Sequence, residues 1–506
     1  MSETRYKVAL ITPYGTVNSG LRLLCSVLRG AGFACDTVFF GTWINNAVRM
    51  PGKREIDALI DLLAARKPDL VGLGFGSPYL AWARWVLAEV RDRLRVPTVA
   101  GGIHPTLSPE DLHGHADYIC VGEGEHALLE LATALRAGRD PRDIQGLHIR
   151  DSLRTKINPV RPLIENLDEL PYRDFHDEGR FTLYGDRVVP GEPLRRARWL
   201  RVYASRGCPY ACEYCYNSSL KAVYGERGNY HRIHSVDWTI GEVLHLRRQL
   251  PKLRRILFDD DTFIFPQSWL DEFCRRWPEE VGLPFDILAH PEALNEKKLT
   301  MLRRAGLEGA QVGIQAASEA ETKELYNRKG GVEQTLAFAQ LCHKLGVNVV
   351  YDVILDNPRA TDTDREMMLD LLGRLPKPYR LFLYSLRVFP KTGLSGSLAS
   401  PPEQIEGRSQ LSLRQFRAGL TWPRTPQDRL FVALVSLASK PLIRASWLRR
   451  AWGNPRWRAN PRPLEWLASV TNLLRLGVMG LKMLGRGELA WYKLREYAGP
   501  TRMLTQ

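Results

Sequence analysis

Three cysteines, Cys208, Cys212 and Cys215, lie within eight residues of one another. Thiolates at this spacing can bind three irons of a cubane cluster, whereas a [4Fe–4S] cluster usually has four cysteine ligands. No fourth cysteine lies near this loop. One iron would therefore keep an open coordination position, where a ligand can bind and react.

Two other interpretations of the triplet are weaker. A zinc site prefers two pairs of cysteines, or one pair with histidines, to reach four ligands. A disulfide framework does not suit a 506-residue chain with eight cysteines and no signal peptide, which points instead to the reducing cytoplasm. The remaining cysteines have apolar neighbours, as is typical of small core residues. They are Cys25, Cys35, Cys120, Cys274 and Cys342.

The cysteines stand in the sequence Ser-Arg-Gly-Cys-Pro-Tyr-Ala-Cys-Glu-Tyr-Cys-Tyr, which resembles the radical S-adenosylmethionine (SAM) superfamily. The resemblance implies that the open iron of a [4Fe–4S] cluster binds SAM, which is cleaved reductively to a 5′-deoxyadenosyl radical. It implies an electron donor such as flavodoxin or ferredoxin. It also implies that Tyr214 lies against the adenine of SAM, the alternative being a core aromatic residue.

Strands and helices alternate over residues 1–140, which predicts a doubly wound, Rossmann-like parallel sheet in an α/β protein. The predicted strands are 7–12, 37–40, 70–74, 98–101 and 118–121, and the predicted helices are 20–31, 56–65, 79–94 and 125–136. Ligands of such sheets bind at the carboxyl ends of the strands, where glycines allow close approach to the backbone.

The loops at those ends resemble the cobalamin-binding domain that precedes the barrel in one branch of the superfamily. They read Gly-Gly-Ile-His-Pro-Thr at 101–106 and Gly-Glu-Gly-Glu at 122–125, and no G-x-G-x-x-G of a nucleotide-binding sheet follows the first strand. The loop at 14–20 contains no histidine, so the resemblance implies cobalt without a lower histidine ligand. We interpret His104 as a hydrogen-bonding loop residue and not as a metal ligand. The implied cobalamin contacts are Ser77, Gly101, Gly102, His104, Glu123 and Gly124.

Residues 141–195 are rich in Pro, Arg, Asp and Gly, and are predicted to form a linker. A second alternation of strands and helices fills residues 196–400. Its six strand–helix units match the (β/α)6 partial barrel of the radical SAM fold, whose active sites lie at the C-terminal ends of the strands. The predicted strands are 201–205, 255–259, 285–289, 309–314, 348–355 and 380–386.

Further candidate SAM-binding residues follow two of these strands. Asp259, Asp260 and Asp261 follow the second strand, and the resemblance implies that Asp260 and Asp261 pair with the ammonium of SAM, the alternative being a helix-capping turn. Three adjacent carboxylates repel one another, so we expect a cation nearby. After the fourth strand, Gln315 can hydrogen-bond ribose hydroxyls, and Ser318 matches a serine of the family pattern.

The last region, residues 401–506, is predicted to be helical after a polar connector at 401–423. From Lys440 onward 13 Lys and Arg face 3 Asp and Glu, so most of the net charge of +15 lies here. Residues 467–484 predict an amphipathic helix that either caps the barrel mouth, which we favour, or lies on an anionic membrane at the inner face. Its apolar face comprises Leu467, Val470, Leu473, Leu474, Val478 and Leu481. No nucleic-acid module is present, and we expect no nucleic-acid partner.

The resemblance implies an enzyme with three cofactors: a [4Fe–4S] cluster, SAM and cobalamin. A methyltransferase acting on an unactivated carbon or phosphorus of a small-molecule or lipid substrate is the favoured activity. It would use the 5′-deoxyadenosyl radical and methylcobalamin. An oxidative cyclase or ring-rearranging enzyme on the same scaffold is the alternative, and a non-enzymatic cobalamin-responsive protein is a third. The sequence does not identify the substrate.

Overall fold

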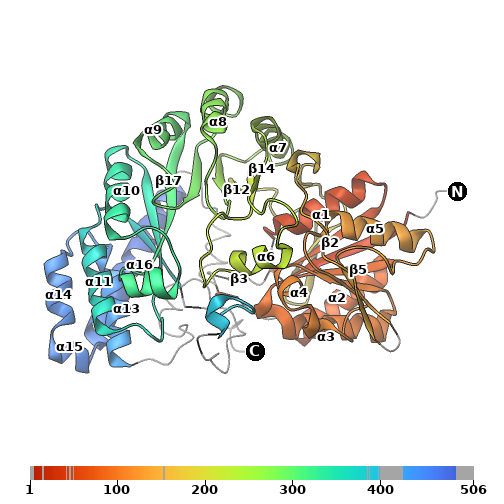
Figure 1. Cartoon of the computed structure of the whole chain (residues 1–506), viewed down its shortest axis with the longest axis horizontal. Helices are drawn as coiled ribbons and strands as arrows, with labels where there is room; N and C mark the ends of the chain where they lie inside the picture. The colour runs from red at the N-terminus through yellow and green to blue at the C-terminus, as the bar shows by residue number, and fades with distance from the viewer. Residues whose placement is uncertain are drawn as a thin grey trace.

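The computed structural model describes residues 5–13, 16–41, 43–44, 47–48, 51–151, 154–384, 386, 388–396, 398 and 425–485. In these residues a mixed nine-stranded sheet and a parallel six-stranded sheet, each covered by helices, lie side by side (Figure 1). The predicted α/β fold is confirmed. The predicted connector at 401–423 and the start of the 14–20 loop lie outside the described residues.

The first sheet has parallel central strands in the order β10-β2-β1-β5-β6-β7. Five of them are the strands expected from the sequence: β1 (Lys7–Thr12), β2 (Ala34–Phe40), β5 (Leu70–Gly74), β6 (Thr98–Gly101) and β7 (Tyr118–Cys120). The strand order reverses between β1 and β5. This reversal opens a crevice at the carboxyl ends, where ligands of doubly wound sheets bind.

Helices cover both faces of this sheet. Residues of α1 (Ser19–Gly30) and α5 (Gly124–Arg136) form one core with Val8 and Leu10 of β1. Residues of α2 (Lys53–Arg66) and α3 (Leu80–Glu89) form the other. Burial of both faces explains the nearly continuous apolar run of β1, as is usual for parallel strands.

The segment at 141–195 is not a plain linker. It contributes β8 (Leu147–Arg150) and β9 (Thr155–Ile157) to one edge of the first sheet, and β10 (Arg180–Tyr184) and β11 (Arg187–Pro190) to the other. The linker prediction is wrong because edge strands are short and tolerate charged residues and proline, which hides them in the sequence. The domain boundaries themselves stay predictions.

The second sheet has six parallel strands in sequence order, with helices on its outer side. The strands are β12 (Trp199–Val202), β15 (Arg255–Phe258), β16 (Phe285–Ala289), β17 (Leu307–Gln315), β18 (Asn348–Ile354) and β19 (Arg380–Tyr384). The helices are α7 (Val236–Gln249), α8 (Gln267–Glu280), α9 (Glu296–Ala305), α10 (Val332–Lys344) and α11 (Asp362–Arg374). The outward-facing side chains, such as Phe258 and Ile287, pack completely under these helices.

Buried ion pairs join the two sheets through the intervening segment. Arg173 donates to Glu242 of α7 at 2.6 Å and to Ser19 of α1 at 2.8 Å. Arg22 of α1 pairs with Glu192 at 2.6 Å, and both side chains are almost completely buried. Removing one partner of such a pair would leave a buried charge uncompensated. The contacts of Arg173 therefore resist separation of the two halves, while the pair of Arg22 and Glu192 fixes the end of the intervening segment to α1.

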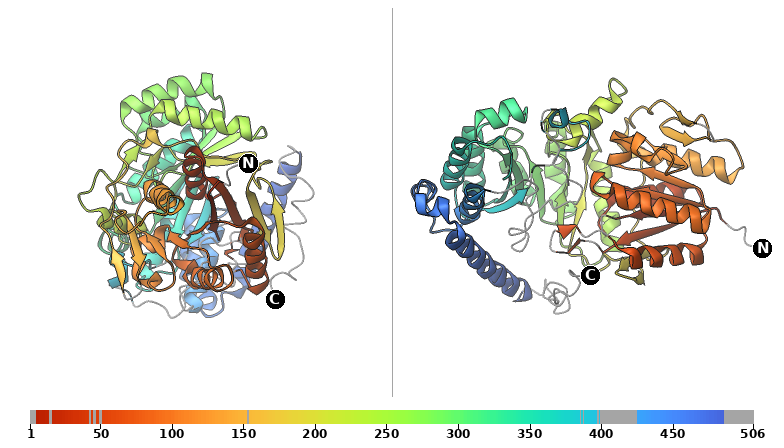
Figure 2. Two further views of the ribbon diagram at one scale, coloured as in Figure 1. Left: turned by 90° about the vertical axis from the view of Figure 1, so that its right-hand side faces the viewer. Right: turned by 90° about the horizontal axis from the view of Figure 1, so that it is seen from below.

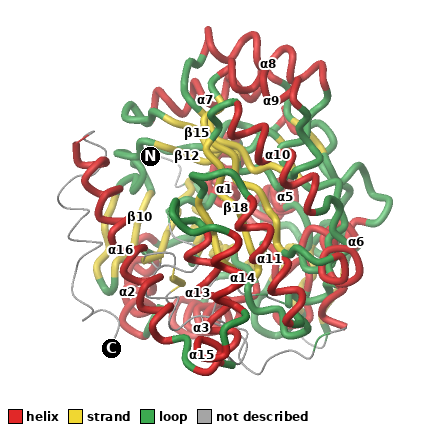
Figure 3. The backbone as a smooth tube through the Cα atoms, turned by 90° about the vertical axis from the view of Figure 1, so that its left-hand side faces the viewer, coloured by secondary structure: helices red, strands yellow, loops and turns green. Residues whose placement is uncertain are grey.

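The C-terminal helices pack at the side of the barrel. The helix α13 (Pro426–Ala438) and the helix α14 (Ala445–Trp452) contact α11, while α15 (Pro455–Ala459) and α16 (Arg462–Gly485) contact α13. Figure 3 shows α11, α13 and α14 together in front of the strands. The predicted cap with a buried apolar stripe is therefore only partly correct. The second half of α16 extends past the barrel (Figure 2) and leaves Leu473, Leu474, Val478 and Leu481 exposed.

No helix in the described ranges is long and apolar enough to cross a membrane.

Candidate active site

The three cysteines lie on the loop between β12 and the helix α6 (Tyr216–Tyr224), at the C-terminal end of the first barrel strand. The amide of Cys215 donates to the carbonyl of Cys212 at 3.0 Å. The hydroxyl of Ser218 donates to the carbonyls of both residues, at 3.0 and 2.7 Å. All three are free thiols, and burial raises the pKa of Cys208 to about 11 and that of Cys215 to about 12.

This arrangement suits a cluster better than a single ion. Across the described part of the chain, no three His, Cys, Asp or Glu side chains converge as one metal ion requires. A cubane instead takes one cysteine at each of several corners, so its ligands need not converge on one point. Metal binding replaces the thiol protons, which makes the donor set of this loop compatible with iron despite the raised pKa values.

Asp260 supports the cysteine loop from the end of β15. Its Oδ1 accepts hydrogen bonds from the amide and the hydroxyl of Ser205, both at 2.6 Å, and the side chain is completely buried. Burial raises the pKa of Asp260 to about 7. Its second oxygen, Oδ2, is buried without a hydrogen-bond partner among the described residues, and the expected contact of this carboxylate with SAM stays a prediction.

The neighbouring aspartates point elsewhere. Asp259 pairs with Arg201 at 2.9 Å and accepts from Tyr203 at 2.9 Å, so the expected cation is present. Asp261 interacts with Asn217 at the start of α6, and desolvation of its carboxyl group raises its pKa. Its contact with SAM stays a prediction. The repulsion that the sequence suggested persists, because Asp261 contributes to the raised pKa of Asp260 and Asp259 contributes to that of Asp261.

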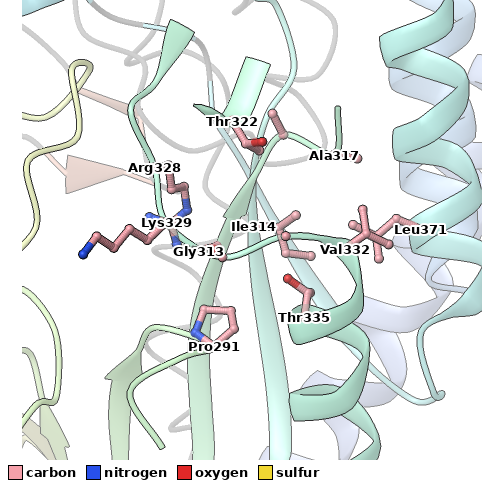
Figure 4. Close-up of a pocket in the computed structure, with 13 residues that line it drawn as sticks. Pro291, Gly313, Ile314, Ala317, Thr322, Arg328, Lys329, Val332, Thr335 and Leu371 are labelled. Carbon is pink, nitrogen blue, oxygen red and sulfur yellow. Dashed lines mark hydrogen bonds between the residues drawn. The ribbon is translucent and has the colours of Figure 1, made fainter. Parts of the chain in front are cut away.

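Arg328 was not expected from the sequence, and it links the cysteine loop to β17. Its guanidinium donates to the carbonyl of Gly313, lies 3.2 Å from the hydroxyl of Tyr214 and 4.0 Å from Sγ of Cys212. It also lines a small pocket at the end of β17 with Gly313, Thr322 and Thr335 (Figure 4). Its only sequence signal was an arginine in a Gly-rich turn, which is not specific.

The surroundings of Tyr214 are compatible with both interpretations, a contact with the adenine of SAM and a core aromatic residue. It packs with Tyr326, Leu386 and Leu394 as a partly buried aromatic, and its hydroxyl meets Arg328. Its predicted adenine contact stays a prediction.

The two candidates that follow β17 differ in environment. Gln315 has a φ of 66° at a bulge in β17, a left-handed conformation that non-glycine residues seldom adopt and that often marks a functional site. Ser318 is buried and caps the next turn by accepting from the amide of Glu321. Gln315 therefore remains a plausible ribose contact, whereas the hydroxyl of Ser318 is engaged within the protein.

In the first domain, the predicted cobalamin loops gather at the carboxyl ends of β5, β6 and β7. Gly102 has a φ of 106°, and a side chain there would collide with the backbone of Phe75, so only glycine fits. His104 is buried, stacks on Phe75, and shares a hydrogen bond of 3.1 Å with Ser77. These contacts agree with a hydrogen-bonding loop residue, and burial lowers the pKa of His104.

Glu123, an expected cobalamin contact, is bound by protein groups. Its carboxylate is bound by Arg206 and Arg232 of the second domain, at 2.9 and 3.0 Å, and by the amide of Ile164 at 2.8 Å. Both oxygens of this carboxylate are engaged by protein donors, and its predicted contact with cobalamin stays a prediction. Sequence reasoning missed the arginines because a contact between distant loops leaves no local signal.

The two sets of loops face each other. The short helix α4 (Ile103–Leu107), which contains His104, contacts α6 directly after Cys215. Figure 1 shows α6 between the barrel and α4. The residues predicted around cobalamin and around the cluster are thus brought to one interface, although they are more than 80 positions apart.

The inner face of the barrel is partly accessible below this interface. Alternate residues of β17 and β18, including Gln311 and Asp352, are half-buried, while their neighbours are buried under the helices. Gln311 donates to both oxygens of Asp352, at 3.1 and 2.9 Å, and Tyr384 also bonds to this carboxyl group. Burial raises the pKa of Asp352 to about 7. No motif of the sequence indicated this polar group.

Comparison with known families decides the identity of both sheets. The model of the B12 binding domain family matches residues 7–132, and that of the Radical SAM superfamily matches residues 202–372. The chain therefore contains a B12-binding domain followed by a Radical SAM domain. The cofactors of this radical SAM protein are accordingly cobalamin, a [4Fe–4S] cluster and SAM.

The names of the relatives indicate more than one activity. It is 27% identical over 321 residues to an uncharacterized methyltransferase of Pyrococcus horikoshii, covering 62% of this chain and 66% of the relative. It is 26% identical over 335 residues to the anaerobic magnesium-protoporphyrin IX monomethyl ester cyclase of Rubrivivax gelatinosus, covering 64% and 56%. The match thus spans about half to two-thirds of the length of these relatives.

Solved structures share the fold of the radical SAM protein. The methyltransferase TsrM of Kitasatospora setae, solved with tryptophan substrate and a SAM analog, has a TM-score of 0.61 at 21% identity, covering 77% of this chain and 75% of that one. OxsB, solved with aqua-cobalamin and SAM, has a TM-score of 0.57 at 19% identity, covering 80% and 57%. At these identities the likeness shows the architecture alone.

The raised pKa of Asp352 predicts a pH-dependent stability. Because the folded pKa of about 7 exceeds the ordinary 3.8, the folded state binds this proton more tightly, and the resulting stabilisation is lost as pH rises from about 4 to 7. Asp352→Asn should remove this decrease in unfolding free energy, because asparagine has no proton to release in this pH range. The difference in unfolding free energy between wild type and variant should therefore change by about 1 kcal/mol per pH unit in this window. Urea denaturation at several pH values measures it, and Asp271→Asn, on the exposed side of α8, controls for loss of a carboxylate.

Proposed function

We propose that this protein is a cobalamin-dependent radical SAM methyltransferase that methylates an unactivated carbon or phosphorus of a small molecule. The observation that carries the proposal is the contact between the two sets of loops, in which α4 of the B12-binding domain packs on α6 beside the cysteine triplet. Chemistry that requires a methyl carrier and a radical source in one reaction needs both to face one substrate.

In this proposal the chain positions cofactors that carry the reactive chemistry. When bound, cluster and SAM supply a 5′-deoxyadenosyl radical, and cobalamin supplies the methyl group. Cys208, Cys212 and Cys215 are the proposed iron ligands, and Asp260 holds the start of their loop through Ser205. Arg328 orients Tyr214, the proposed adenine contact, through a hydrogen bond to its hydroxyl. A small-molecule substrate and a redox partner, such as flavodoxin or ferredoxin, complete the reaction.

The relatives support methyl transfer more than ring formation. Besides the methyltransferase of Pyrococcus horikoshii, they include tryptophan 2-C-methyltransferase of Streptomyces laurentii, 22% identical over 69% of this chain and 67% of the relative. The cyclase of Rubrivivax gelatinosus keeps oxidative cyclisation as the second candidate. The Asp352 group on the inner barrel face suits a substrate that carries a hydrogen-bonding group.

A labelled methyl group distinguishes the two candidates. We expect the anaerobically reconstituted protein, given cobalamin, a reductant and SAM with a deuterated methyl group, to form a methylated product in an extract of the native host. Methyl transfer should release S-adenosylhomocysteine and 5′-deoxyadenosine together, as detected by mass spectrometry. Release of 5′-deoxyadenosine alone, with no labelled product, would instead indicate the cyclase activity.

Replacement of the cysteines tests the proposed ligands individually. Cys208→Ala, Cys212→Ala and Cys215→Ala should each lower bound iron severalfold after reconstitution and abolish SAM cleavage, because a cubane with two cysteine ligands is poorly held. Cys274→Ala, at a half-buried cysteine of α8, is the matched control and should retain both. Iron analysis and chromatography of 5′-deoxyadenosine are the measurements, and a full iron content in all three variants would contradict the assignment.

We further propose that α16 places the enzyme at an anionic membrane surface, where a lipid substrate could reach it. Its exposed apolar residues Leu473, Leu474, Val478 and Leu481 form a stripe next to Arg475. Burial and Arg475 lower the pKa of nearby Lys440 to about 8, which indicates a cation without full compensation. Apolar side chains combined with excess positive charge are typical of helices that bind anionic lipid interfaces.

Vesicle binding tests this placement. The protein should co-sediment with vesicles containing anionic phospholipid and bind neutral vesicles weakly. The double variant Leu473→Glu/Leu481→Glu should weaken binding by about tenfold or more, because two buried leucines each contribute on the order of 1.5 kcal/mol. Ile157→Glu, which changes an exposed apolar residue of the first domain, should bind as the wild type does. Equal binding by both variants would contradict a role for α16.

A further inference from the structure

Two arginines lie opposite each other immediately before the cysteine triplet. The short strands β13 (Ser205–Arg206) and β14 (Arg232–Ile233) form an antiparallel ribbon in which Arg206 and Arg232 are cross-strand partners. Like charges directly opposite each other destabilise a sheet, and an isolated two-stranded ribbon is marginal by itself. Arg206 is followed by Gly207 and Cys208, so the geometry of this ribbon sets where the cysteine loop begins.

Carboxylates of the B12-binding domain compensate these arginines. Arg206 donates to Glu123 at 2.9 Å and to Glu125 at 2.6 Å, and Arg232 donates to both oxygens of Glu123 at 3.0 Å. The four side chains are only 6 to 23% exposed. Charge pairs at this degree of burial are poorly screened, and removal of one partner is costly.

The segment between the domains closes the same network. The amide of Ile164 donates to Glu123 at 2.8 Å, and its carbonyl accepts from Arg232 at 2.6 Å. Burial alone would raise the pKa of Glu123, but Arg232 and Arg206 hold it below the ordinary value. Both oxygens of this carboxylate are thus engaged by protein donors, and the carboxylate is held in its charged form.

We propose that Glu123 and Glu125 are positioning residues that register the cysteine loop on the B12-binding domain. The ribbon that carries the loop is stable only when the two carboxylates separate its arginines. The cluster and cobalamin therefore take up a fixed mutual geometry through protein charge pairs, whichever substrate is bound. The effect on coupling of the cofactors rests on the proposed function, whereas the effect on the loop does not.

Hydrogen exchange of the full chain, as purified, tests the loop directly. Glu123→Gln keeps the shape of the side chain but leaves two facing arginines without their shared anion. Amides in the peptide 204–217 should then exchange about tenfold faster or more. Glu130→Gln is the matched control, because Glu130 lies on the same helix α5 and pairs with Arg161 at the surface. It should leave exchange in 204–217 unchanged.

A second substitution separates positioning from cobalamin contact. In Glu123→Gln/Arg232→Gln the facing charges are relieved, so exchange in 204–217 should return most of the way to the wild-type rate. Glu125→Gln, which releases only one contact of Arg206, provides a milder variant if Glu123→Gln folds poorly, and it should show a smaller increase. Wild-type exchange in Glu123→Gln and Glu125→Gln, or no recovery in the double variant, would overturn the proposal.

The reconstituted enzyme supplies an independent measurement. Electron paramagnetic resonance of cob(II)alamin and the reduced cluster should show one well-defined spin coupling in the wild type and a broadened distribution in Glu123→Gln. The number of 5′-deoxyadenosine molecules formed per methyl transferred should rise severalfold. If the wild type shows no methyl transfer, the proposed function fails while the exchange result still stands. If Glu123→Gln weakens cobalamin binding without changing exchange, Glu123 is a cofactor contact and the inference fails.

Discussion

Buried carboxylates hold the cysteine loop in place, and the proposed chemistry depends on that hold. The loop has little regular secondary structure, so its backbone donors and flanking charges need partners outside it. Asp260, at the end of β15, accepts from the amide and hydroxyl of Ser205 on one side. Glu123, after β7, binds Arg206 on the other. Each carboxylate stands at the carboxyl end of a parallel strand, where doubly wound sheets and barrels place their ligands.

The same constraint explains why two sheets are needed. Neither carboxylate alone fixes the loop, since one belongs to the barrel and the other to the B12-binding domain. Buried contacts of Arg173 with Glu242 of α7 and with Ser19 of α1 keep the halves from separating. A rigid interface lowers the entropic cost of aligning reactive centres, which is the main contribution a protein makes when cofactors perform the chemistry.

Among the described residues, regions away from this interface do not contact the cysteine loop. The Asp352 group lies deeper in the barrel, where a substrate would be recognised, and it supports no part of the cysteine loop. The helix α16 is attached through its first half to α13 and exposes its second half. Substrate choice and location can thus change without disturbing the geometry of the cofactors, in line with related folds that carry methyltransferase and cyclase activities.

The amino-acid sequence alone was enough for the α/β class, for most strands and helices of the two sheets, and for the resemblance of both domains to known families. Hydrophobic periodicity and the Cys208 triplet involve residues close together in the chain, so they can be recognised from the sequence. The edge strands at 141–195, the partners of Glu123 and Asp260, and the role of Arg328 were decided only by tertiary structure. The physical reason is that charges compensate one another through space, and Glu123 meets Arg232 across 109 positions that leave no pattern in the sequence.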